Sequence, residues 1–174
     1  MKRVLAICGS TKFASTNERI LRAIARAYSE GIEVDFYAGV DRLPHFNPDL
    51  DDDDPPPAVA ELRRLIESVD GVLISTPEYI FSLPGVLKNA IEWTVSTTVF
   101  TDKPAAFVIA ATSGERAFES LAQILRTIGA KIDDESMILI RGARAKLDER
   151  DQIVDDSMLD DVERMMTAFL RNMD

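Results

Sequence analysis

The chain has one cysteine, Cys8, and one histidine, His45, among its 174 residues. Cys8 ends a run of apolar residues, where a cysteine most often serves as a small core residue. Zinc sites usually need several histidine or cysteine ligands, and no second histidine or cysteine accompanies His45. A serine hydrolase would need this histidine as a base and a G-x-S-x-G turn, which is also missing. These absences argue against a metal site and against serine-hydrolase chemistry.

Basic residues are outnumbered by acidic ones, and long apolar runs are missing. The chain has 20 Lys and Arg against 30 Asp and Glu, a net charge of −10. Nucleic acids and anionic membranes bind clusters of Lys and Arg, so neither is an expected partner. No apolar run reaches the length that spans a bilayer, and the first residues turn polar too soon for a signal peptide. We therefore expect a cytoplasmic protein that forms one domain, residues 1–174.

Two glycine-rich phosphate-binding motifs are absent as well. The sequence has no G-x-x-x-x-G-K-[ST] and no G-x-G-x-x-G, which excludes the usual loops for nucleoside triphosphates and dinucleotides. Instead, residues 4–17, VLAICGSTKFASTN, predict a buried strand that ends at Gly9, a short loop, and a helix that begins near Thr16. The hydroxyl groups of this loop belong to Ser10, Thr11, Ser15 and Thr16.

A helix N-terminus offers free N–H donors and the positive end of the helix dipole. With Lys12 and the hydroxyl groups beside it, this loop favours one terminal phosphate. An alternative stays open, because Ser and Thr side chains at such positions commonly do no more than cap the helix.

Hydrophobic periodicity predicts five strands that alternate with five helices. The expected strands are residues 4–8, 32–37, 71–76, 105–111 and 136–140. The expected helices begin near residues 16, 57, 84, 115 and 155, and the third of them extends to residue 97. In the second strand Ile32, Val34 and Phe36 alternate with more polar residues, which predicts one buried face and a place at the sheet edge.

This pattern predicts a doubly wound α/β sandwich with a parallel sheet of order 2-1-3-4-5 and helices on both faces. In that order a ligand binds at the carboxyl ends of strands 1 and 3, where the loops after Gly9 and Thr76 converge. Residues 38–57 contain five prolines and the aspartate run 51–54, which predicts an irregular, solvated acidic loop rather than a calcium site.

Two segments resemble the flavodoxin-fold NADPH-dependent FMN reductases, the family that also contains quinone, chromate and azo-dye reductases. They are GSTKFASTN, residues 9–17, and PEYIFSLPGVLKNAIEW, residues 77–93. The resemblance implies FMN and NADPH or NADH as cofactors, and a quinone, azo dye, metal oxyanion or free flavin as electron acceptor. It implies no catalytic side chain, because the flavin itself does the chemistry. The cofactor-binding residues that it implies are Ser10, Lys12, Ser15, Thr16, Asn17, Pro77, Glu78, Tyr79, Ile80, Ser113 and Gly114.

Three positions differ from those of many family members. Lys12 stands in place of an Arg, which exchanges a planar two-point phosphate contact for a point charge. Ile80 stands where Asn is common, and residues 112–116, TSGER, replace a Gly-Gly pair. For this last loop two interpretations are open: Glu115 crowds or repels the flavin, or Arg116 stabilises negative charge on the reduced flavin.

The resemblance also implies a homodimer or a tetramer of dimers, with Trp93 in the subunit interface. Two other functions suit the same fold, namely an FMN-binding electron carrier and a cofactor-free binding or regulatory protein. A carrier usually has a T-x-T-G-x-T type of loop and does not oxidise NADPH. A receiver domain needs acidic residues after strand 1 and an Asp at the end of strand 3, where this chain has Cys8-Gly9 and Thr76.

Overall fold

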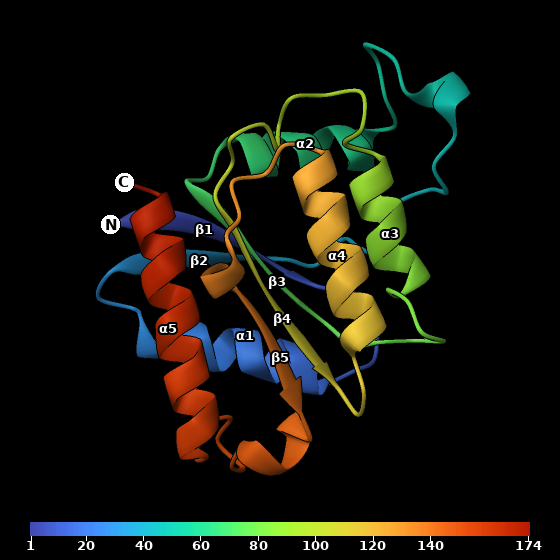
Figure 1. Ribbon diagram of the computed structural model, residues 1–174. Helices are drawn as coiled ribbons and strands as arrows, with labels where there is room; N and C mark the ends of the chain where they lie inside the picture. The colour runs from blue at the N-terminus through green and yellow to red at the C-terminus, as the bar shows by residue number, and fades with distance from the viewer.

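A computed structural model describes residues 1–174 and shows a parallel sheet between two layers of helices (Figure 1). The strands are β1 (Lys2–Cys8), β2 (Ile32–Tyr37), β3 (Gly71–Thr76), β4 (Ala105–Ala111) and β5 (Met137–Arg141). The helices are α1 (Thr16–Ala27), α2 (Pro57–Glu67), α3 (Gly85–Glu92), α4 (Glu115–Thr127) and α5 (Asp156–Asn172). The strand order is β2-β1-β3-β4-β5, so the predicted doubly wound sandwich is confirmed.

Strand side chains point alternately to the two faces, and each face has its own core. Leu5 and Ile7 of β1 pack on the side of α2, α3 and α4. Val4 and Ala6 alternate with them along the strand and pack on the side of α1 and α5. Because both faces are covered, the central strands are apolar throughout, as parallel strands usually are. None of the helices is both long and apolar enough to cross a bilayer.

The second strand lies at the sheet edge as predicted, but two of its side chains differ from the expected pattern. Phe36 was expected to be buried and is 38% exposed, with the Arg22 guanidinium 4.9 Å from its ring centroid. Tyr37 was expected on the wet face and is 8% exposed. The loop that follows β2 covers this end of the strand with Val40 and Leu43, which belong to the same core as Tyr37. The loop has therefore buried the end of the face that the alternation assigned to solvent, at Tyr37, while Glu33 on the same face stays exposed.

Burial of Tyr37 gives a testable dependence of stability on pH. Burial raises the pKa of the Tyr37 phenol to about 12 from its ordinary value of 10.0, and the negative charge of Glu61 is the second cause. The unfolded chain releases this proton near pH 10 whereas the folded chain retains it, so stability is lost as the pH rises from 10 to 12. The loss from this group is about 2 to 3 kcal/mol. Urea unfolding at pH 9 and pH 11.5 should show a smaller difference in Tyr37→Phe than in the wild type, and an equal difference would contradict the assignment.

Trp93 is a core residue, and its predicted place in a subunit interface is wrong. Its side chain is 0% exposed, and its Nε1 donates a hydrogen bond of 2.8 Å to the Pro44 carbonyl. The ring of Phe46 packs edge-on against it, with 5.1 Å between the centroids. The loop after β2 thus lies over the indole ring. The helix before it, α3, is also shorter than predicted, since it ends at Glu92 and not at residue 97.

Two further details were predicted only in part. The fifth strand runs from Met137 to Arg141, one residue later than predicted, because a 3₁₀ turn (Asp134–Ser136) precedes it. In the acidic loop, Asp51 pairs with Arg63 and accepts a hydrogen bond of 2.7 Å from Ser96 Oγ. The side chain of Asp51 is consequently only 6% exposed, whereas residues 52–54 are exposed as expected.

Candidate functional site

The loops after β1 and β3 are in direct contact at the carboxyl edge of the sheet. The Gly9 N–H donates to the Ser75 carbonyl over 2.8 Å. A Cβ atom on Gly9 would lie 2.6 Å from Cβ of Thr76 and 3.0 Å from Cδ2 of Leu87. Only a residue without a side chain lets the backbones approach so closely. The predicted convergence of these two loops is thus present, and α1 begins beside it.

The N-terminus of α1 keeps free donors. Ser15 is its cap, because the Ser15 Oγ accepts a hydrogen bond of 3.1 Å from the Glu18 N–H. The alternative interpretation of the hydroxyl groups therefore holds for this one residue. No group of the protein accepts from the backbone N–H of Thr16 or of Asn17. Lys12 is exposed nearby and forms no ion pair.

Asn17 contributes its backbone and its side chain in two different directions. Its amide side chain is buried and contacts the sheet, accepting from Ser75 Oγ at 2.9 Å and donating to the Ala110 carbonyl at 3.5 Å. Its backbone N–H is one of the two that remain free in the first turn of α1, beside that of Thr16. The predicted phosphate contact of Asn17 therefore rests on the backbone.

The N-terminus of α4, by contrast, is already filled. Gly114 precedes the helix with φ of 104° and has no side chain that could cap it. The carboxylate of Glu78, from the loop after β3, accepts hydrogen bonds of 3.0 Å from the N–H groups of Arg116 and Ala117. A carboxylate at this position stabilises the helix dipole as an anionic ligand would. Of the helix N-termini that reach this crevice, α1 is open to an anion and α4 is closed by Glu78.

An exposed apolar turn follows β3. Tyr79 and Ser82 exchange backbone hydrogen bonds of 2.9 and 3.1 Å, which closes the turn. Its two central residues, Ile80 and Phe81, have φ of 50° and 56°, a strained region for side chains of this kind. Ile80 is 96% exposed and Phe81 is 78% exposed, as is Phe13 to 96% in the loop after β1. We refer to Phe13, Tyr79, Ile80 and Phe81 as the apolar rim.

The two charged residues after β4, Glu115 and Arg116, each have a partner of opposite charge. Glu115 forms an ion pair with Arg141 at the end of β5, and this hydrogen bond holds the pKa of the Glu115 carboxyl below its usual range. Arg116 pairs with Glu119 on the same helix at 2.9 Å. Each of the two side chains thus has a partner of opposite charge, and both interpretations of this loop stay predictions.

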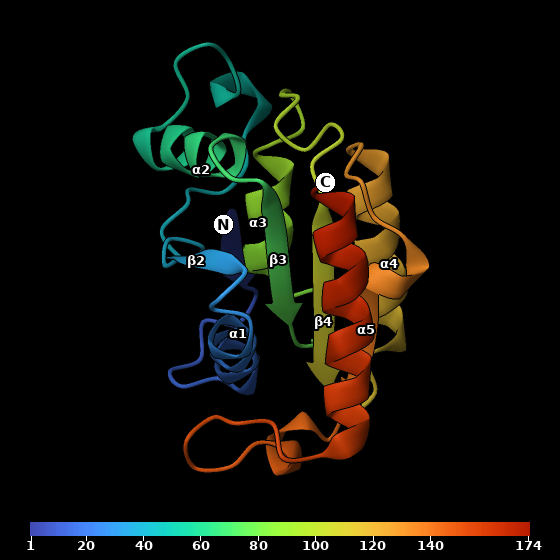
Figure 2. The same cartoon turned by 90° about the vertical axis from the view of Figure 1, so that its left-hand side faces the viewer.

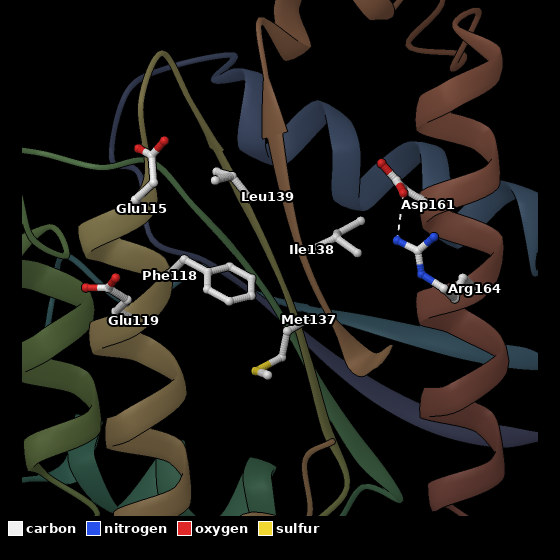
Figure 3. A pocket seen from close by; sticks show the side chains of 8 residues that line it. All are labelled: Glu115, Phe118, Glu119, Met137, Ile138, Leu139, Asp161 and Arg164. Atoms are coloured by element: carbon white, nitrogen blue, oxygen red, sulfur yellow. Dashed lines mark hydrogen bonds and ion pairs between the residues drawn. The ribbon is translucent and has the colours of Figure 1, made fainter. Parts of the chain in front are cut away.

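A separate groove of about 490 Å³ lies between α4 and α5, over the edge strand β5 (Figure 3). Phe118, Met137 and Leu139 form its apolar floor. Of the charges on its rim, Asp161 and Arg164 pair with each other at 2.7 Å, and Glu115 and Glu119 pair with arginines outside the groove. Because β4 separates this groove from the loops after β1 and β3, it is not part of the candidate site.

The loop after β5 supports α1 from outside. Residues 142–155 pass below the carboxyl ends of the strands and reach α1 (Figure 2). There Arg19 pairs with Asp151 and donates to the Asp148 carbonyl at 2.6 Å. Arg26 donates to the Asp151 carbonyl at 2.6 Å. This support was not predicted from the sequence, because opposite charges far apart in the sequence do not show that they pair.

Ser75 was also not predicted from the sequence as a residue of the site. The feature that could have indicated it is a polar residue near the end of an apolar strand.

Comparisons with known proteins agree on one family. The sequence model for the family described as NADPH-dependent FMN reductase matches residues 2–143. An NADH:(hydroxy)cinnamate reductase subunit of Vibrio ruber is 34% identical over 172 residues, which are 95% of this chain and 84% of the relative. A quinone reductase of Escherichia coli K12 is 30% identical over 177 residues, 96% of this chain and 93% of the relative. The solved structure of a flavoenzyme NAD(P)H:(acceptor) oxidoreductase from Paracoccus denitrificans superposes with a TM-score of 0.82 at 24% identity, covering 99% of this chain and 97% of the other, which shows a shared fold.

Proposed function

Because the chain belongs to the NADPH-dependent FMN reductase family, we propose that it is an oxidoreductase that binds FMN between the β1 and β3 loops and passes electrons from NAD(P)H to a small-molecule acceptor. The quinone reductase among its relatives supports a quinone as that acceptor. Azo dyes, metal oxyanions and free flavin are the other acceptors that we propose to test. When bound, FMN supplies the ring that takes hydride from NAD(P)H and returns electrons to the acceptor.

The observation that carries this proposal is the contrast between the two helix N-termini. The first turn of α1 has two free N–H donors, at Thr16 and Asn17, and Lys12 adds a positive charge. This donor set fits a terminal phosphate, and the hydroxyl group of Ser10 lies in the same loop, whereas that of Ser15 caps α1. The adjacent terminus of α4 needs no anion, because Glu78 supplies one.

The ring of the flavin is the part that the β3 and β4 loops would hold. We propose that the backbone of Pro77, Glu78 and Ile80 meets its edge, and that Tyr79, which is 49% exposed, provides an aromatic wall. Ser113 and Gly114 would approach it from the loop after β4. The side chain of Glu78 is engaged with α4, so only its backbone is available for this contact.

An absorbance spectrum of the purified protein tests the function. The protein is recorded before and after addition of FMN and removal of the excess on a desalting column. Flavin bands that stay with the protein and bleach when NADPH is added are the expected result. Retained flavin that NADPH does not bleach would indicate an electron carrier instead. Flavin that washes through would contradict FMN binding and favour a cofactor-free protein with the same fold.

Lys12→Ala should weaken FMN binding about fivefold and leave riboflavin binding unchanged, because riboflavin lacks the phosphate that the ammonium group contacts. Lys12→Arg should retain or improve FMN affinity, since a guanidinium group can make two parallel contacts. Lys131→Ala is the control, because this exposed lysine lies beside the opposite end of β4. Fluorescence titrations of the wild type and of each variant with FMN and with riboflavin give the dissociation constants. Equal losses for both flavins in Lys12→Ala would contradict a phosphate contact.

We also propose that the protein acts in the cytoplasm as a single-domain chain that assembles into a homodimer or a tetramer of dimers. The apolar rim supports an assembled state, because Ile80 and Phe81 expose adjacent apolar side chains in one turn, and exposed apolar patches are typical of an interaction surface. Trp93 takes no part in this proposal, since it is fully buried. Analytical ultracentrifugation that shows only a monomer at micromolar concentration would contradict it.

A further inference from the structure

Asn17 stands at the junction of the helix and the sheet. It lies in the first turn of α1, yet its side chain is 4% exposed because the amide extends between β3 and β4. Its main partner, Ser75, is 0% exposed. One residue thus connects the open end of α1 with the ends of two adjacent strands.

This connection differs from the other contacts of α1. Ile20 and Ile24 hold the helix against the sheet through apolar packing, which has little directionality. The hydrogen bond from Ser75 Oγ to the Asn17 Oδ1 is 2.9 Å long, buried and directional. A buried polar pair of this kind costs free energy when it is broken, so it fixes the rotation and tilt of the first turn.

We propose that Asn17 is a positioning residue for the FMN phosphate, which acts through its bond to Ser75 and not through a side-chain contact with the ligand. The bond sets the direction of the free N–H groups of Thr16 and Asn17, which are the donors that the phosphate would meet. This inference rests on the proposed function, because it concerns how the chain holds the cofactor of that function. It predicts an effect on the phosphate end of the cofactor alone.

The test compares the binding of FMN with that of riboflavin in Ser75→Ala, Asn17→Leu and the double variant. Each single variant should lower the ratio of FMN affinity to riboflavin affinity about tenfold, with riboflavin affinity within twofold of the wild type. The double variant should lose no more than either single variant, because both remove the same bond. Thr94→Val is the matched control: it removes another buried hydroxyl group, beyond the far end of α3, and should leave the ratio unchanged.

A role in stability alone gives a different result. It would lower the melting temperature of the variants while the ratio stays at the wild-type value, and this outcome would overturn the inference. Additive losses in the double variant would overturn it as well, since Asn17 would then act independently of Ser75. If Asn17→Leu does not fold, Ser75→Ala by itself still separates a changed affinity ratio from a loss of stability alone. A wild-type protein that binds neither flavin would overturn the proposed function. A wild-type protein that prefers FMN, together with variants that keep the same affinity ratio, would overturn only this inference.

Discussion

Gly9→Ala should destabilise the protein by about 1 to 3 kcal/mol, which is the usual cost of a forced contact in a packed interior. It should also weaken FMN binding at least tenfold. The new methyl group would lie 2.6 Å from Cβ of Thr76 and 3.0 Å from Cδ2 of Leu87. Thr76 is 0% exposed and is part of β3, so it has little room to move. The loop after β1 must then move instead, and its hydrogen bond to the Ser75 carbonyl is lost with it.

The effect on binding should follow from the same displacement. The loop that Gly9 begins leads to the cap of α1 within six residues, so a shift at Gly9 moves the free N–H groups that we assign to the phosphate. Urea unfolding and FMN titration of the same preparation measure both effects. Gly85→Ala is the control, because a Cβ atom there has no neighbour within 4 Å, and it should be neutral or slightly stabilising. Wild-type stability in Gly9→Ala would show that the two loops are less tightly packed than the structure indicates.

The strands were the most predictable part of the chain. The bounds of β2, β3 and β4 are those that the sequence predicts, because each apolar run stops at a turn residue or at a change of polarity. The order of the strands follows from the apolar centres of β1, β3 and β4 and from the half-polar β2, since parallel sheets bury their middle strands. The position of the crevice follows from that order.

The errors arise where one segment folds over another that is far away in sequence. Tyr37 and Trp93 are buried by the loop after β2, which is rich in proline and aspartate and reads as a solvated segment. Local periodicity carries no information about such a cover. The contact of the Asn17 side chain with the sheet could not be predicted for a similar reason, since its partner Ser75 is 58 residues away along the chain.

Replacing Glu78 should separate the two parts of the site. Its carboxylate accepts from two N–H groups at the start of α4, and both bonds are charge-assisted and lie at the positive end of a helix dipole. Glu78→Ala leaves these donors without a partner, so we expect a loss of about 2 to 3 kcal/mol in unfolding free energy. Glu78→Gln retains an acceptor of nearly the same shape and should lose about half as much. Thermal and urea unfolding measure the difference.

Glu78→Ala should also weaken the binding of FMN and of riboflavin together, whereas the Lys12 and Asn17 variants should weaken FMN binding alone. Without the bond to α4 the turn from Tyr79 to Ser82 loses its attachment, and we assign this turn to the flavin ring. FMN and riboflavin share that ring, so Glu78→Ala should weaken both by the same factor. Glu119→Ala is the control, because this carboxylate is exposed and pairs with Arg116 on the surface of the same helix. A loss confined to FMN would place Glu78 at the phosphate instead of the ring. Equal losses here, beside phosphate-specific losses at Lys12 and Asn17, would assign the β3 loop to the ring and the β1 loop to the phosphate.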